Sequence, residues 1–303
     1  MHRTAQEIGS YPNAIARTLK TNRSYNLGVL FVDEHASGLT HAFFASVLNA
    51  FKTEAEQSGY DITFINHNIG GQKMTYMEHC RYRNVDGVCL ACVDFHTPEV
   101  LELVESSIPC VTIDHIFHNR MAVMSENTEG VRTMVNHICA LGHRKIAFIH
   151  GQSGASVTES RLTGFWRGLE ENDVTVVPEY LVPCDYDNPA RTYRETKRLL
   201  QLEDRPTCII LPDDHSYMGA MQAAREAGLD IPGDISFVGF DGIRLTQLIY
   251  PRLTTVGQDT TAMGREAARC LISRIENPRT AGSKVVSIPC SIIKGETLGP
   301  CKA

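Results

Sequence analysis

The sequence lacks the features of a membrane or secreted protein. No apolar run approaches the roughly 20 residues that a membrane-spanning helix needs, and residues 1–24 lack the short apolar core of a signal peptide. The 303 residues are 43% hydrophobic and 21% charged, which is ordinary for a globular protein. We therefore expect a soluble, cytoplasmic protein, with two lobes of about 150 residues preferred over one large domain.

Common signatures of catalytic and nucleotide-binding sites are also missing. The chain has no GxxxxGK[ST], no GxGxxG between a strand and a helix, no HExxH and no GxSxG. Twelve histidines are present, but most stand alone, and a lone histidine is more often a structural residue than a catalyst. We expect neither an enzyme nor a bound cofactor.

The ten cysteines do not form a pattern typical of metal or disulfide sites. They are scattered singly from Cys80 to Cys301, mostly in apolar stretches, which predicts small buried thiols. The one close pair, Cys89 and Cys92, lies in a strand-like run at 87–93, where a spacing of three places the side chains on opposite faces. Without a second pair, we expect no metal site.

Charge is distributed unevenly along the chain. The net charge is −6, yet the first 24 residues carry four basic side chains against Glu7 alone, a local balance of +3 that leaves the remainder near −9. The acidic part should repel nucleic acid. A basic segment attached to an acidic body is one interpretation, and an ordinary solvated tail is the other.

Short apolar runs alternate with amphipathic helical stretches from Asn26 onward, in a β-α-β rhythm. The first series predicts strands at 27–32, 61–66, 87–93 and 110–114, with helices at 43–57, 74–82, from 98, and at 128–141. A second series predicts strands at 145–150, 207–211 and 235–240, with helices at 160–172, from 189, and at 215–227. Further segments at 253–256, 260–277, 284–289 and 291–294 suggest that the chain crosses again between two lobes.

Nearly continuous apolar strands such as Cys208–Leu211 are typical of parallel sheets covered on both faces. We therefore predict an α/β fold with two doubly wound lobes. Ligands of such sheets bind beyond the carboxyl ends of the strands, and two lobes create a cleft, so polar residues that follow a strand are the first candidates for a site.

Residues 11–20 read YPNAIARTLK and resemble the hinge helix of the LacI/GalR family of transcription regulators. Further motifs resemble the family in its own order, among them NVDGV at 84–88, ALGHRKIA at 140–147, VGFD at 238–241 and LTTV at 253–256. The resemblance covers essentially the whole chain. It implies a periplasmic-binding-protein-like fold of two parallel-sheet lobes with three crossovers, near His143–Lys145, Gln258–Asp259 and Ala281–Lys284. The implied domains are a hinge remnant at 1–24, a first lobe at 25–143 plus 259–281, and a second lobe at 144–258 plus 282–303.

By the same resemblance the chain is a homodimeric sensor whose effector, expected to be a sugar, controls DNA binding through lobe closure and the hinge helices. The family's helix-turn-helix precedes the hinge, and residues 1–10 match only the tail of its last helix, so operator DNA is expected as a partner of a full-length form. The hinge residues carried over are Asn13, Arg17, Leu19 and Lys20, with Leu19 wedged in the minor groove and Arg17 and Lys20 near phosphates. A plain packing role for Leu19 stays open.

Four positions carry the most weight as candidates for effector binding, namely Asp241, Arg161, Asp213 and Tyr186. Asp241 ends a strand, and its carboxylate can accept hydrogen bonds from two sugar hydroxyls. Arg161 matches the family's effector-binding arginine, whose rigid fork of donors can bridge two oxygens. The alternatives are a helix cap for Asp241 and a solvated side chain for Arg161.

The other two of these positions, and three further candidates, follow from the resemblance. Asp213 stands where the family more often has Asn, and a carboxylate there favours a ligand that offers hydroxyls or a cation. Tyr186 stands where the family has an aromatic residue beside the sugar. The alternative for Tyr186 is ordinary packing at the rim. Asn127 matches a family ligand residue but caps the predicted helix at 128–141 equally well, and we favour the cap. His41 and Phe43 follow a loop that is longer than the family's and are candidates at the cleft mouth.

Two rival functions share these residues. A transport-type sugar-binding protein has the same two-lobed body, although residues 11–20 would serve no purpose there. A sugar-modifying enzyme would use Asp213 and Asp241 as an acid/base pair. Whether the effector acts as an inducer or a co-repressor stays open.

Overall fold

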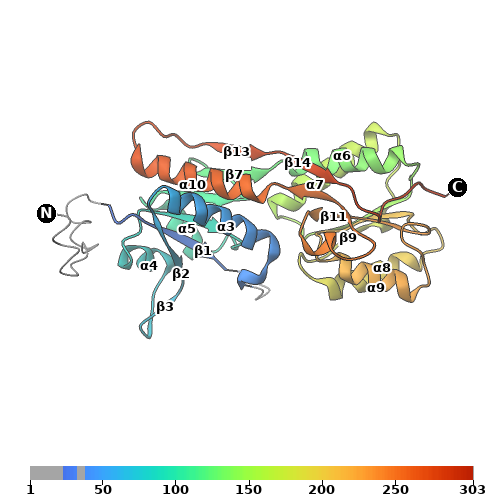
Figure 1. Ribbon diagram of the computed structural model, residues 1–303, viewed down its shortest axis with the longest axis horizontal. Coiled ribbons are helices and arrows are strands. Elements are labelled where there is room, and N and C mark those ends of the chain that lie inside the picture. The colour runs from blue at the N-terminus through green and yellow to red at the C-terminus, as the bar shows by residue number, and fades with distance from the viewer. Residues whose placement is uncertain (1–22, 33–37, 303) are drawn as a thin grey trace, which may run out of the picture. The chain divides into compact units, whose positions relative to one another are not determined.

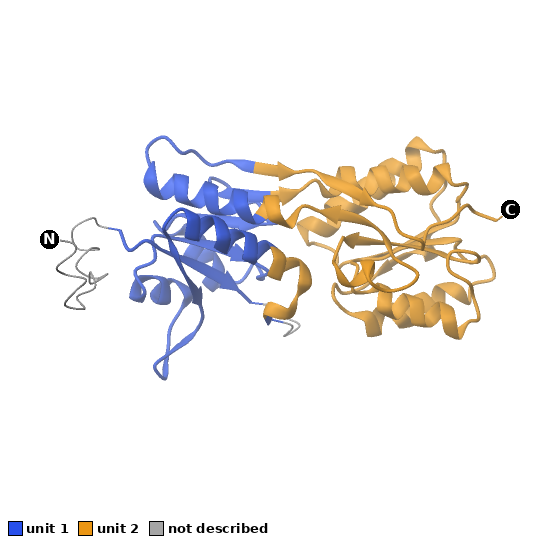
Figure 2. Ribbon diagram, in the orientation of Figure 1, with its two compact units in different colours: residues 1–38, 47–123, 264–285 blue, residues 39–46, 124–263, 286–303 orange. Residues whose placement is uncertain are grey.

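The computed structural model describes residues 23–32 and 38–302 (Figure 1). The hinge candidates Asn13, Arg17, Leu19 and Lys20 lie outside these residues. Two compact units divide the chain (Figure 2). Unit 1 comprises the chain up to Gly38, Val47–Val123 and Gly264–Val285, and unit 2 comprises Leu39–Ser46, Met124–Met263 and the chain from Val286.

The first sheet has the strand order β13-β7-β6-β5-β1-β2, and β1 pairs in parallel with both β2 and β5. Its strands are β1 (Asn26–Phe31), β2 (Asp61–Ile65), β5 (Gly87–Ala91), β6 (Cys110–Ile113), β7 (Met121–Ser125) and β13 (Val285–Ile288). The accompanying helices are α3 (Ala42–Gln57), α4 (Tyr76–Tyr82), α5 (Pro98–Glu105) and α10 (Thr260–Glu276), with the short turn η1 (Gly38–Thr40) and the hairpin β3 (Asn68–Ile69) and β4 (Gln72–Lys73). Every residue of β5 is buried, as a strand covered on both faces requires.

The second sheet repeats this topology with the order β14-β12-β11-β10-β8-β9. Its strands are β8 (Ile146–His150), β9 (Leu181–Pro183), β10 (Cys208–Ile210), β11 (Ser236–Asp241), β12 (Thr254–Gln258) and β14 (Cys290–Ile293). Its helices are α6 (Asn127–Ala140), α7 (Ser156–Glu171), α8 (Pro189–Leu200) and α9 (Tyr217–Glu226), with the turns η2 (Pro178–Tyr180) and η3 (Leu245–Gln247). The predicted doubly wound α/β fold is confirmed, except that β14 pairs antiparallel with β12 at the edge.

Unit 2 has a hydrophobic core on each face of its sheet. Alternate residues of one strand enter opposite cores, because successive side chains of a strand point to opposite faces: Ile210 packs with α6 and α7, and Ile209 packs with α8 and α9. The sheet is thereby held rigidly between helices, and its carboxyl edge is left to carry polar groups.

Helix α6 belongs to unit 2, whereas the family resemblance predicts it in the first lobe. Its Val131 and Met134 share a core with Phe148 and Phe165. Gly164 of α7 permits the close approach, since a Cβ there would lie 2.2 Å from the Thr128 carbonyl oxygen. The β-α-β rhythm predicts a helix at this position but does not specify which sheet the helix covers.

The unit boundaries and the end of one strand differ from their predicted positions. The division between units falls after Val123, well before the predicted crossover at 143–145, whereas the later two fall a few residues beyond their predicted positions. The strand containing Cys89 ends at Ala91, and Cys92 follows it with a positive φ of 53°. Over residues 23–32 and 38–302, no helix is long and apolar enough to cross a membrane, and no group of three metal-ligating side chains occurs.

Candidate functional site

Polar side chains gather at the carboxyl ends of three neighbouring strands of unit 2. Asp213 and Asp214 follow β10, Asp241 ends β11 and Gln258 ends β12. Because β10, β11 and β12 are parallel neighbours, their ends meet at one edge of the sheet. Arg161, from α7, contacts this edge and completes a cluster within a single unit.

The guanidinium of Arg161 is fixed by three different contacts. Its Nε donates to Oδ1 of Asn127 at 2.9 Å, and its Nη1 donates to the Pro212 carbonyl at 2.8 Å. Its Cζ lies 3.5 Å from the centre of the Phe240 ring, a stacked arrangement that favours the cation. Only 6% of Arg161 is exposed, so the alternative of a solvated arginine is wrong.

Asp241 faces Arg161 without a close ion pair. Its Oδ1 accepts a hydrogen bond from Nε2 of Gln258 at 2.7 Å and lies 3.9 Å from Nη2 of Arg161. Burial raises the pKa of the Asp241 carboxyl well above its usual range, and the nearby guanidinium offsets part of this rise. No protein donor to Oδ2 of Asp241 occurs in the described residues, which leaves an acceptor for a ligand. The cap alternative for Asp241 is wrong, since η3 follows Arg244 and has no side-chain cap.

The backbone of Asp241 is strained. Its φ is +122°, in a region that residues other than glycine rarely adopt. Such a conformation costs about 1–3 kcal/mol, persists only where the surroundings enforce it, and is commonest at functional sites. Glycine would adopt this φ without strain, but the residue at this position carries a carboxylate instead.

Gln258 was not among the ligand candidates from the sequence. It is 9% exposed, and its Oε1 is buried without a hydrogen-bond partner within the described part of the chain. The amide nitrogen of Gln258 donates to Oδ1 of Asp241, and the amide oxygen therefore points away from that carboxyl group. An unpaired buried acceptor is unfavourable by about 1–3 kcal/mol, and a ligand hydroxyl would remove this penalty. Its position as the last residue of a buried strand is the signal that could have found it.

Asp214 holds the loop that follows Asp241. Its Oδ2 accepts from the backbone N–H groups of Gly242 at 3.0 Å and Ile243 at 2.9 Å and from the Thr246 hydroxyl, while its Oδ1 accepts from the Thr255 hydroxyl. The residue is fully buried, and burial raises its pKa to about 7, although the hydrogen bonds oppose the rise.

The carboxylate oxygens of Asp213 also accept hydrogen bonds from the protein. Its Oδ1 accepts from the Ser216 backbone, and its Oδ2 accepts from the Ser216 hydroxyl and from the Asp187 backbone. Both oxygens therefore have protein donors, and the carboxylate joins the start of α9 to the loop that carries Tyr186.

Tyr186 lies beside Arg161, with its ring centre 5.4 Å from the guanidinium carbon. Its hydroxyl shares a hydrogen bond of 2.9 Å with the Thr158 hydroxyl, and burial raises its pKa, so the phenol is neutral at pH 7. The following residue, Asp187, is hydrogen-bonded to His215, which fixes the loop from the other side.

Asn127 does not cap its helix, so the favoured prediction was wrong. Glu126 is the residue before α6, no side-chain cap is present, and Asn127 is the first helical residue. Its side chain turns inward instead: Nδ2 donates to the Ser125 carbonyl at 3.1 Å, and Oδ1 accepts from Arg161. At 2% exposure it positions the guanidinium.

His41 directly precedes α3 and Phe43 lies in its first turn, in a segment that belongs to unit 2. The rings of both pack against Phe44 at 5.0 Å between centres, and Phe43 is 5% exposed. Nδ1 of His41 is buried and has no partner among the described residues, so it could take a ligand hydrogen bond.

Unit 1 carries a ring cluster that the sequence analysis did not single out. Phe95 follows β5 and His115 follows β6, and their rings stack with 4.3 Å between centres and 7° between planes. Phe117 packs edge-on against His115, and burial lowers the pKa of this histidine, so its ring is uncharged at pH 7. Flat rings after two neighbouring strands are a surface for the apolar face of a ligand.

Two doubly wound sheets with a polar cluster at a carboxyl edge define an effector-binding body of the periplasmic-binding-protein type. Residues 135–298 match the model of the periplasmic binding protein-like domain family. The transcriptional repressor PurR of Pectobacterium atrosepticum is 31% identical over 280 residues, which are 90% of this chain and 80% of the relative. PurR of Haemophilus influenzae is 28% identical over 89% of this chain and 80% of the relative.

Solved structures agree with these matches. A putative LacI regulator from Bacillus cereus subsp. cytotoxis superimposes with a TM-score of 0.82 at 25% identity, covering 91% of this chain and 99% of that one. A LacI-family regulator from Enterococcus faecium, solved with bound ribose, gives 0.78 at 24% identity over 91% and 100% of the two chains. The complex of the regulator CelR with cellobiose gives 0.78 at 21% identity over 98% and 89%. The chain belongs to the LacI family of transcriptional regulators and contains its effector-binding body.

Proposed function

We propose that this chain senses a sugar through the cluster of Arg161, Asp241 and Gln258 and so regulates transcription. The observation that carries the proposal is the buried Oε1 of Gln258, which has no donor among the described residues and stands beside the Asp241 carboxyl group and a fixed guanidinium. A molecule with adjacent hydroxyls donates to Oε1 and to this carboxyl group, and Nη2 of Arg161 donates to a ring oxygen or a hydroxyl. The sugars in two related regulator structures, ribose and cellobiose, support this ligand class.

The remaining candidates have supporting roles in this proposal. Tyr186 offers its ring to the apolar face of the sugar. Asn127 and Asp213 are positioning residues, since their polar atoms are taken up by Arg161 and by the loop around Asp187. His41, with its unpaired Nδ1, and Phe43 border the ligand.

Two macromolecular partners belong to this proposal: operator DNA, because of family membership, and a second copy of the chain, because of exposed apolar side chains. Operator DNA is the macromolecular partner in this proposal, and the effector biases DNA binding by its different affinity for two conformations. A homodimer is supported by large apolar side chains exposed in unit 2, Leu248 at 70% and Tyr250 at 79%. The cytoplasm is the proposed location, where DNA and metabolite meet.

A thermal-shift screen tests the ligand class. Because a ligand that binds only the folded state raises stability by RT ln(1 + [L]/Kd), a binding sugar should raise Tm progressively with its concentration. Arg161→Lys should abolish the shift, since an ammonium cannot reproduce the guanidinium fork. Arg244→Lys is the matched control, because Arg244 is exposed in the same unit. Nucleobases or amino acids raising Tm while no sugar does would overturn the sugar assignment.

The geometry gives little support to a sugar-modifying enzyme. Asp213 has both oxygens occupied by protein donors and is therefore a poor partner for Asp241 in acid/base catalysis. Incubation with a sugar panel followed by chromatography should detect no turnover. Product formation that disappears in Asp241→Ala would contradict the sensor function.

A further inference from the structure

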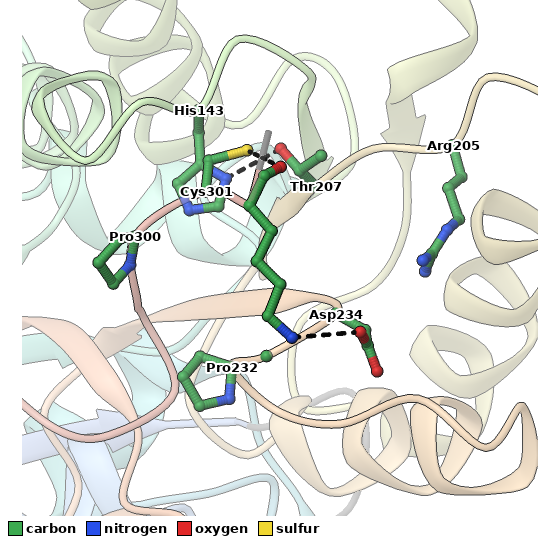
Figure 3. Close-up of a pocket in the computed structure, with 9 residues that line it drawn as sticks. His143, Arg205, Thr207, Pro232, Asp234, Pro300 and Cys301 are labelled. Carbon is green, nitrogen blue, oxygen red and sulfur yellow. Dashed lines mark hydrogen bonds and ion pairs between the residues drawn. The ribbon is translucent and has the colours of Figure 1, made fainter.

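A pocket lies at the opposite edge of the unit 2 sheet from Arg161. Its volume is about 160 Å³, and Thr207 and Asp234 line it just before β10 and β11 begin (Figure 3). His143, which precedes β8, and Cys301 and Lys302 of the carboxyl-terminal segment complete it. The amino ends of the same strands whose carboxyl ends carry the effector cluster thus form a separate concave site.

Arg205 contributes positive charge to this pocket, and its guanidinium is not fully hydrogen-bonded within the described residues. Nη1 of Arg205 is buried and has no hydrogen-bond partner among the residues that the structure describes. In Figure 3 the Arg205 side chain extends into the pocket on the side of Asp234. A guanidinium stays protonated in proteins and has no acceptor function, so an unpaired buried nitrogen can be satisfied only by an acceptor.

The one acidic side chain of the pocket is already engaged. Oδ2 of Asp234 accepts from the Asp230 backbone at 2.9 Å, and Oδ1 lies 3.7 Å from Nζ of Lys302. Both oxygens of Asp234 therefore have partners, whereas Nη1 of Arg205 has none and is left for an incoming acceptor.

The wall opposite Arg205 is rigidly held. Nδ1 of His143 bonds to the Thr207 hydroxyl at 2.9 Å and Nε2 to the Gly299 carbonyl at 2.9 Å, and burial lowers the pKa of this histidine. The Cys301 backbone donates to the Leu141 carbonyl at 2.9 Å. His143 is accordingly a neutral anchor for the carboxyl-terminal segment, and the pocket keeps its shape without a ligand.

We propose that this pocket binds a small oxyanion, of the size of phosphate or a short carboxylate. Nη1 of Arg205 and Nζ of Lys302 donate to its oxygens in charge-assisted hydrogen bonds. The volume admits one such group together with a few water molecules, and excludes a bulky polyanion. The proposal is independent of the effector site and stands or falls without it.

Calorimetric titration with inorganic phosphate, at low ionic strength and with sodium chloride as the blank, tests the proposal. We expect saturable binding with Kd below about 1 mM, weakened at least tenfold in Arg205→Gln and severalfold in Lys302→Gln. Arg244→Gln, at an exposed arginine of the same unit, should leave binding unchanged. Parallel titrations with acetate and succinate distinguish a carboxylate ligand from a phosphate one. Absence of saturable binding for all three anions, or full binding by Arg205→Gln, would overturn the proposal.

Alkylation of Cys301 supplies a local readout. Its thiol is partly exposed in the pocket wall, so a bound anion should slow its modification by iodoacetamide, measured on the carboxyl-terminal peptide by mass spectrometry. The protection should disappear in Arg205→Gln. Anion binding without protection of Cys301 would place the anion elsewhere and contradict the assignment.

Discussion

Asp214→Ala should lower the free energy of unfolding of unit 2 by about 2–4 kcal/mol. The substitution leaves the backbone N–H groups of Gly242 and Ile243 without their acceptor, and each unsatisfied group in a buried setting is unfavourable by about 1–3 kcal/mol. The Thr246 hydroxyl adds little, because it also donates to the Ile243 carbonyl.

Asp214→Asn is the matched variant. An amide oxygen can still accept from both backbone groups, and the amide nitrogen can donate to the Thr255 hydroxyl, which then reverses its role. The loss of stability at pH 7 should therefore stay below about 1 kcal/mol. The two variants together separate the loss of an acceptor from the loss of a charge.

The contribution of Asp214 to the free energy of unfolding falls as pH rises. Burial raises the Asp214 pKa to about 7 from an ordinary value of 3.8, so its stabilising contribution is complete below pH 3.8 and is lost as pH rises toward 7. Between pH 5 and pH 7.5 the wild type should lose roughly 3 kcal/mol relative to Asp214→Asn, an upper figure from about two pH units at 1.36 kcal/mol each. The variant cannot titrate at this position.

Urea unfolding followed by tryptophan fluorescence measures these differences. Trp166 is the single tryptophan of the chain and lies in α7 of unit 2, where it is 42% exposed and packs edge-on against Phe165. Equal midpoints for the Ala and Asn variants would refute the role of the carboxylate as an acceptor. A difference between wild type and Asp214→Asn that does not change with pH would refute the raised pKa.

Three further substitutions test the site and the packing behind it. Gly164→Ala should destabilise unit 2 by about 1–3 kcal/mol, because the new Cβ would lie 2.2 Å from the Thr128 carbonyl, whereas Gly282→Ala, where no atom lies within 4 Å, should be neutral in the same urea assay. Asp241→Gly should be more stable than Asp241→Ala by about 1–3 kcal/mol in the urea assay, because both lose the carboxylate and only glycine adopts a φ of +122° without strain; equal stabilities would contradict the strained φ. Gln258→Ala should change stability by less than about 1 kcal/mol, since it removes one hydrogen bond and one unpaired acceptor, yet weaken the effector at least tenfold by calorimetry, and unchanged affinity would exclude it from the site.

The sheet architecture follows from the sequence because its signals are local. Continuous apolar runs at β8, β10 and β11 with amphipathic stretches between them predict parallel strands and covering helices. The assignment of α6 to a unit failed because it depends on contacts between segments far apart in the chain. Those contacts rest on Gly164, whose missing Cβ lets α7 approach α6, and a single glycine in a helical pattern does not reveal its partner.

The site was predictable in part for the same reason. Asp241 is the last residue of a buried strand, so its place at the carboxyl edge was predictable from the chain alone. The inward turn of Asn127 could not be, because a residue at a helix start favours a cap in isolation, and only the buried guanidinium of Arg161 reverses that preference. The unpaired oxygen of Gln258 likewise depends on which neighbour takes its amide nitrogen.

Calorimetric titration of the sugars found by thermal shift, into wild type and Asp241→Asn, tests the central claim most directly. The substitution removes the acceptor Oδ2 and the charge but keeps an oxygen for Nε2 of Gln258, so the fold should be retained, as the Trp166 urea transition would verify. The account predicts saturable sugar binding by the wild type and at least tenfold weaker binding by the variant, a loss of about 1.4 kcal/mol or more. Equal affinity in both proteins would contradict the assignment of this cluster as the effector site.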